Sequence, residues 1–259
     1  MAERLRAYPL RTSLVLEAFF VALTLLGAVA LRAAFPSLPG YSVRGPSQSL
    51  VLVLVAAALL LALIAALRWW RLAASTRPAE WRDLHLYWLP IALLAVPFIR
   101  GIRAVPLGAL GVLVVGYAAT AVFEEGLWRG VILGLLRPTG VWQAVLISSV
   151  LFGLAHLGNS ALRGFSVIVA LQAFGAAVQG IGFAALRLRT NTIWPLILIH
   201  MLHDLFLQMG NLPIAAVDAP IATILAMYGI LLLRGRRDLA TPDGDADAPA
   251  GRQDWATNR

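Results

Sequence analysis

Long apolar runs follow one another along this chain and constrain its fold more than any other feature. Hydrophobic residues make up 60% of the 259 positions and charged residues only 13%, which is too apolar for an ordinary soluble domain. A helix of about 20 residues crosses a bilayer core of roughly 30 Å, and it satisfies its own backbone hydrogen bonds there. The sequence therefore predicts an all-α fold, a polytopic membrane protein.

The apolar runs predict about eight transmembrane helices. They are expected at residues 13–33, 48–69, 84–100, 106–136, 141–157, 164–187, 192–209 and 214–233. Together they make up one predicted transmembrane domain, residues 1–235, with a motif-bearing core at 106–209. Residues 236–259 are polar, acidic and rich in Ala, Pro and Gly, which is typical of a disordered tail.

The charge pattern indicates how the chain lies in the membrane. All 21 basic residues are arginine, and the net charge is +8. If the N-terminus is cytoplasmic, the inside segments hold 15 arginines and the outside segments 5, as the positive-inside rule requires. We therefore expect a multi-pass plasma-membrane protein with both termini in the cytoplasm. The basic charge then faces lipid headgroups, and no nucleic-acid partner is expected. Because the sequence contains no cysteine, disulfides and thiolate chemistry are excluded.

Ionisable side chains lie within three of the predicted spans. Such groups cost about 2.5–3.5 kcal/mol at the centre of a membrane helix and therefore point to function. At about 1.5 Å per helical residue, Glu124 and His156 lie roughly 20 Å deep and His200 and Asp204 roughly 12–18 Å deep, in one central to outer-middle layer, which predicts one shared polar cavity between the helices. The residues are Glu124, Glu125 and Arg129 in the fourth span, His156 in the fifth, and His200, His203 and Asp204 in the seventh.

The spacing of these residues predicts a different role for each of the two glutamates. Residues four apart share a helix face, so Glu125 can pair with Arg129. Glu124 points about 100° away around the helix and would be left as an unpaired carboxylate, the form that a general base needs. His200 and Asp204 are also four apart and can face the same cavity.

Three motifs in this region resemble those of a known family. Glu124-Glu125-x-x-x-Arg129, Phe152-x-x-x-His156 and His200-x-x-x-Asp204 are similar in order and spacing to the motifs of the CPBP, or Abi, family, which includes the membrane-embedded CAAX proteases of the Rce1 type. The resemblance implies an intramembrane glutamic endopeptidase that acts on a peptide or membrane-protein substrate in the bilayer. It implies that Glu124 and His156 activate water, that His200 and residue 204 stabilise the oxyanion, and that Glu125 and Arg129 hold the first motif.

Position 204 departs from the eukaryotic members of that family, which have Asn there. An ionised Asp cannot donate a hydrogen bond to an oxyanion. Asp204 must therefore either be protonated or orient His200 while other groups donate. No cofactor is expected for this mechanism.

Other polar residues and other functions stay open at this stage. His203 lies three residues from His200 and could also face the cavity, whereas Glu17 is expected to reach the membrane interface and Asp218 to be solvated. Gln172 is expected to form a hydrogen bond between helices. The same Glu, His and Asp residues could bind Zn²⁺ in a metalloprotease, relay protons in a transporter, or line the pocket of a non-catalytic immunity protein.

Overall fold

The protein is described here by a computed structural model that covers residues 1–160, 164–236 and 239. Helices dominate these residues, and the only β-type pairing among them is an isolated bridge between Ile102 and Gly210. The α-helices are α1 (Ala2–Arg6), α2 (Pro9–Ala34), α3 (Gln48–Leu67), α4 (Trp88–Leu93), α5 (Leu107–Glu124), α6 (Leu133–Leu136), α7 (Val141–His156), α9 (Val167–Thr190), α10 (Trp194–Met209) and α11 (Ile214–Leu233). A π-helical segment, η3 (Glu125–Ile132), joins α5 to α6, and short 3₁₀ helices are η1 (Trp81–Tyr87), η2 (Val96–Phe98), η4 (Arg137–Thr139) and η5 (Leu157–Asn159).

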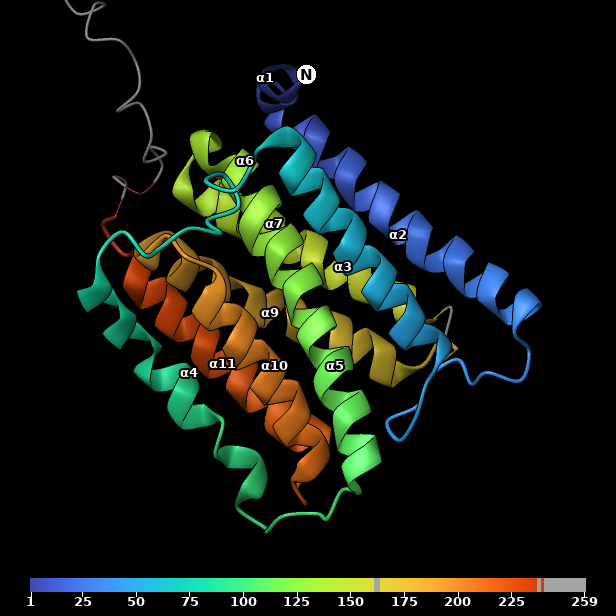
Figure 1. Ribbon diagram of the computed structural model, residues 1–259. Helices are drawn as coiled ribbons and strands as arrows, with labels where there is room; N and C mark the ends of the chain where they lie inside the picture. Colours follow the sequence, from blue (N-terminus) through green and yellow to red (C-terminus); the bar gives the residue numbers. More distant parts are fainter. Residues whose placement is uncertain (161–163, 237–238, 240–259) are drawn as a thin grey trace, which may run out of the picture.

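The helices form a bundle in which α5 has a central place (Figure 1). Helix α5 packs against α3 and α10, and α2 covers the outer side of α3. Helix α9 packs against α7 and α11. This arrangement brings the three segments that carry the polar residues, namely α5 with η3, α7 and α10, into one part of the bundle.

The expectation of a polytopic all-α membrane protein is confirmed, but not the count of eight spans. Within the described residues, six helices are long and apolar enough to cross a membrane. Helix α10 has 16 residues, short of the roughly 20 that a span requires. The six helices are Pro9–Ala34, Gln48–Leu67, Leu107–Thr139, Val141–Asn159, Val167–Thr190 and Ala216–Leu233.

The predicted span 84–100 is wrong as a single helix. The chain runs there through η1, α4 and η2, which are separate short helices. Pro90 and Pro97 lack a backbone N–H, so neither can continue the hydrogen-bond ladder of a long helix. The segment still packs along α11, where the Tyr228 hydroxyl donates to the Leu86 carbonyl at 3.0 Å. The predicted tail, residues 236–259, lies outside the described residues except for Arg236 and Leu239.

Two apolar clusters fill the interior. One joins α2, α3, η3, α6 and α7, and the other joins η1, α10 and α11. Helix α9 contributes to both, with Ala184 and Ala185 in the first cluster and Phe183 and Leu186 in the second. The polar site described below lies where the two clusters meet.

A buried connection after α3 approaches the π-helical segment closely. A Cβ on Gly130 would make a tight contact, 3.1 Å from the Ala73 carbonyl oxygen, and a Cβ on Gly134 would collide with the Leu72 carbonyl oxygen. The guanidinium of Arg187 links the segment after α3 to η3. Its Nη2 donates to Leu72 O at 2.7 Å, and its Nε donates to Arg129 O at 3.1 Å. Glycine at positions 130 and 134 therefore fixes how deeply the segment that carries Glu125 and Arg129 is buried.

This contact predicts that Gly134→Ala destabilises the protein. Overpacking of this kind typically costs about 1–3 kcal/mol, and here the obstacle is backbone that cannot move aside cheaply. The purified protein in detergent should unfold at a lower temperature. Gly111→Ala is the matched control, because Gly111 lies in the same candidate span, Leu107–Thr139, but has no atom within 4 Å of the added methyl group. Equal unfolding temperatures for the two variants would contradict the prediction.

Candidate active site

The first motif lies on a change of helix type. Helix α5 ends at Glu124, and η3 begins at Glu125. A π-helical turn bonds residue i to i+5, and such turns are frequent at functional sites. All eight residues of η3 are buried, so the charged groups of Glu125 and Arg129 must find partners inside the bundle.

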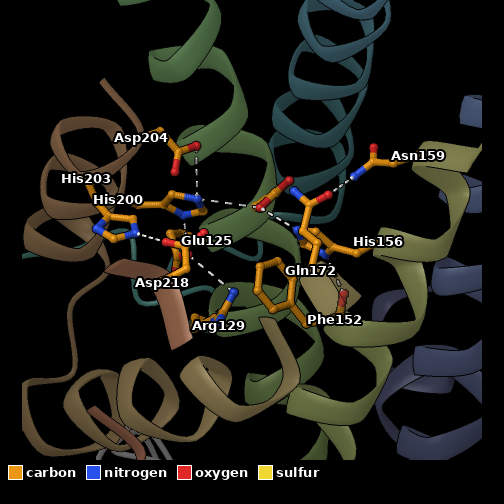
Figure 2. A network of polar contacts seen from close by, with 11 residues as sticks. Glu125, Arg129, Phe152, His156, Asn159, Gln172, His200, His203, Asp204 and Asp218 are labelled. Atoms are coloured by element: carbon orange, nitrogen blue, oxygen red, sulfur yellow. Dashed lines mark hydrogen bonds and ion pairs between the residues drawn. The ribbon is translucent and has the colours of Figure 1, made fainter. Parts of the chain in front are cut away.

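Glu125 shares one carboxylate oxygen between two helices. Its side chain is fully buried, and Oε1 accepts a hydrogen bond from His200 Nδ1 at 2.7 Å and from Arg129 Nη1 at 3.3 Å (Figure 2). The pairing of Glu125 with Arg129 agrees with their spacing. The contact with His200 was not predicted, because sequence spacing cannot show which faces of two helices meet.

Arg129 is held by aromatic rings as well as by charge. Its guanidinium lies 3.8 Å from the ring centre of Phe152 and 5.6 Å from that of Phe183. Both distances are within the range of cation–π attraction, which is stronger at desolvated sites. Since Arg129 is only 2% exposed, these contacts compensate part of the cost of burying its charge.

Glu124 lies between two histidine rings. Its Oε2 is 3.6 Å from His200 Nε2 and 4.0 Å from His156 Nε2. These separations exceed a direct hydrogen bond, and a water or substrate atom placed beside Glu124 Oε2 could contact both the carboxylate and an imidazole. The side chains of Glu124, His156 and His200 are 17%, 12% and 11% exposed, so the group is accessible and not sealed. The structure thus brings together the three residues that were expected to share a cavity.

Each histidine has one nitrogen already committed. His156 Nδ1 lies 2.8 Å from the Phe152 carbonyl oxygen, which can only accept, so Nδ1 must be the donor. His200 Nδ1 likewise faces Glu125 Oε1. In a neutral ring the proton is then on Nδ1, and Nε2 keeps its lone pair. Both histidines therefore direct an Nε2 towards Glu124.

Asp204 and His203 take different places on α10. Asp204 Oδ2 is 3.7 Å from His200 Nε2, and the Asp204 side chain is 26% exposed. His203 does not face the site: its Nε2 lies 3.0 Å from Asp218 Oδ1 on α11 (Figure 2). The idea that His203 could join the cavity is therefore wrong. Asp218 is 43% exposed, as expected near a helix end, but it is paired rather than simply solvated.

Two further expectations had different outcomes. Gln172 does bridge two elements, since its Oε1 accepts from Asn159 Nδ2 at 3.4 Å. Glu17 does not reach the membrane interface as expected. It is 8% exposed, and its Oε2 accepts a 2.9 Å hydrogen bond from the indole Nε1 of Trp128. The indole donor holds this carboxylate inside the bundle, and no pattern in the sequence predicts the contact.

The carboxylates and histidines do not form a ready metal site. In the part of the chain that the structure describes, no group of three or more His, Asp and Glu residues has the geometry to hold a metal ion. The zinc alternative therefore has no geometric support in these residues, and it remains a matter for experiment.

Comparison with known proteins agrees with the motifs. Residues 106–206 match the family model described as Type II CAAX prenyl endopeptidase Rce1-like. This match supports the assignment of residues 106–206 to the Rce1-like family. No curated protein and no solved structure matches the chain. The Rce1-like segment runs from α5 to α10 and contains every polar residue of the site, so at the level of the family this is a membrane endopeptidase.

The buried ion pair of the Rce1-like segment can be tested directly. Arg129→Met should leave the Glu125 carboxylate with one partner instead of two. Breaking a buried pair by removing one member typically costs about 3–5 kcal/mol, so the variant should unfold at a clearly lower temperature in detergent. Arg129→Lys should lose less, because lysine keeps the charge but not the planar contact with Phe152.

Arg103→Met serves as the control, since Arg103 is exposed and lies outside the site. If Arg129→Met unfolds at the same temperature as the control, the pair does not stabilise the fold in the way described.

Proposed function

We propose that this protein is an intramembrane endopeptidase in which Glu124, with His156, activates a water molecule for attack on a peptide bond. The observation that carries the proposal is the position of Glu124 Oε2, 3.6–4.0 Å from the Nε2 atoms of two histidines. A water beside these atoms would have a carboxylate to receive its proton and an imidazole lone pair to orient it.

The chemical step follows from these positions. The water oxygen attacks the peptide carbonyl carbon while one water proton passes to Glu124. The carbonyl oxygen becomes an oxyanion. Collapse of this intermediate breaks the C–N bond, and the proton held by Glu124 passes to the leaving nitrogen. One water is consumed, and a carboxylic acid and an amine are formed, between which the second water proton passes to give a carboxylate and an ammonium group.

His200 and Asp204 are proposed to stabilise the oxyanion, with His200 acting as the imidazolium, the form in which Nε2 carries a proton while Nδ1 donates to Glu125. A donor aimed at the developing charge typically contributes about 10²–10³ in rate. Glu125 already holds Nδ1 of His200 at 2.7 Å, so the ring does not need Asp204 to fix its orientation. This supports a direct role for Asp204, whose protonated form could donate a hydrogen bond to the oxyanion.

Glu125 and Arg129 are proposed to hold the site without reacting. The Oε1 atom of Glu125 makes two contacts, both with groups of the protein, and the Glu125 side chain is not exposed. The substrate is proposed to be a peptide or membrane protein that reaches the site from the bilayer. We further propose a plasma-membrane location with both termini in the cytoplasm, on the basis of the arginine distribution, with no cofactor and no nucleic-acid partner.

The central test is Glu124→Gln. Glutamine has the same shape but cannot take up the proton, so hydrolysis should fall by about 10²–10⁴ while the protein stays folded. The measurement is the set of peptides released when isolated membranes from a host that lacks the gene are supplied with each purified variant. Full activity of Glu124→Gln would refute the role of Glu124 as the base.

Two controls make this test specific. His203→Gln changes a histidine on the same helix that faces Asp218 instead of Glu124, and the glutamine amide can still donate to Asp218. This variant should therefore retain activity, whereas His156→Gln should lose it. A chelator should have no effect on the wild-type protein. Activity that disappears with chelation and returns with Zn²⁺ would instead favour a metalloprotease.

Asp204→Asn tests the oxyanion role. A carboxyl group donates a hydrogen bond only while protonated, whereas an amide donates at any pH. The variant should therefore keep or increase the activity and extend it to higher pH. The measurement is the pH–rate profile of the purified variant beside the wild type. A large loss of activity over the whole pH range would show that Asp204 acts as an anion and not as a donor.

A further inference from the structure

Helix α2 lies outside the Rce1-like segment, yet it contacts the site through a buried carboxylate. Glu17 is on α2, 8% exposed, and no described basic residue pairs with it. A carboxylate within a membrane helix costs about 2.5–3.5 kcal/mol, so its burial calls for a compensating interaction. That interaction is the 2.9 Å hydrogen bond from Trp128 Nε1 to Glu17 Oε2.

A second contact from α2 lies one turn along the same helix. Phe20 packs on Phe123, with ring centres 5.2 Å apart. Phe123 immediately precedes Glu124, and Trp128 immediately precedes Arg129. The two contacts therefore hold the stretch that contains the first motif at both of its ends. They fix its rotation about the helix axis, which decides where Glu124 and Arg129 point.

Trp128 passes this restraint on to the second motif. Its ring packs on Phe152 with centres 5.2 Å apart. Phe152 in turn supports the Arg129 guanidinium at 3.8 Å and the His156 ring at 4.6 Å, and its carbonyl oxygen accepts from His156 Nδ1. A change in the position of Trp128 would therefore move Phe152, and with it the groups on both sides of Glu124.

We infer that Glu17 is a positioning residue for the active site, which acts through its hydrogen bond to Trp128 and does not touch the reacting atoms. The inference rests on the proposed function. Without the acceptor, the indole N–H would be left unpaired in an apolar interior, and the ring would shift to find another partner. Small displacements of catalytic groups are costly, since about 1 Å can reduce a rate by 10²-fold.

The test is a double-mutant cycle with a conservative rescue. The variants are Glu17→Leu, Glu17→Gln, Trp128→Phe and the combination of Glu17→Leu with Trp128→Phe. Phenylalanine keeps the aromatic packing and removes only the N–H, and glutamine keeps an acceptor oxygen. Glu80→Gln is the matched control, because Glu80 is an exposed carboxylate away from the site. For each variant kcat, KM and the unfolding temperature are measured in detergent on a peptide that the wild type cleaves.

A role through the hydrogen bond predicts a specific pattern. Glu17→Leu and Trp128→Phe should each lower kcat by about 10-fold with little change in KM, as expected for a small displacement of catalytic groups. The double variant should be no worse than either single one, because both remove the same bond. Glu17→Gln should keep most of the wild-type kcat, and Glu80→Gln all of it.

Three results would overturn the inference: unchanged kcat in Glu17→Leu, additive losses in the double variant, or a loss in Glu17→Gln as large as in Glu17→Leu. The last would mean that the charge of Glu17, and not its bond to Trp128, matters. These failures differ from failure of the proposed function, in which the wild type would show no cleavage that depends on Glu124.

Discussion

One carboxylate oxygen, Oε1 of Glu125, holds the site together. It accepts from Arg129 on its own segment and from His200 on α10, so it fixes the distance between two parts of the bundle. The arginine can stay in the interior because its guanidinium lies between Phe152 and Phe183, which belong to different apolar clusters. The buried charges therefore depend on both clusters being packed, and the packing at their junction depends on the charges being paired.

This arrangement gives two adjacent glutamates different roles. Glu125 is fully buried and accepts hydrogen bonds from two donors. Glu124 is 17% exposed, and its contact with His200 is 3.6 Å, longer than a hydrogen bond. The difference comes from a rotation of one residue around the helix axis, which directs one side chain into the packed interior and the other towards the histidines. Since Glu125 is already occupied by donors within the protein, it leaves Glu124 as the carboxylate that can meet a water or a substrate.

The sequence predicted what depends on spacing along one helix and on depth in the membrane. It paired Glu125 with Arg129 and brought Glu124, His156 and His200 to a similar level, and the contacts of the structure agree. It could not predict which faces of different helices meet, because packing of the whole bundle decides that. The contacts of His200 with Glu125, of Glu17 with Trp128 and of His203 with Asp218 are all of this kind. The π-helical turn and the division of residues 84–100 also depend on local backbone bonding that hydropathy does not report.

Helix α10 shows how such contacts support one another across the bundle. It is a short helix of 16 residues. Its two histidines, three residues apart, bond to two different neighbouring elements. His200 reaches Glu125 at the end of α5, and His203 reaches Asp218 on α11. A rotation of α10 about its axis would displace both histidines, so the two bonds together restrict its rotation more than either alone. His203 thus matters to the site without facing it, because a helix held from two sides presents His200 and Asp204 to Glu124 in one orientation.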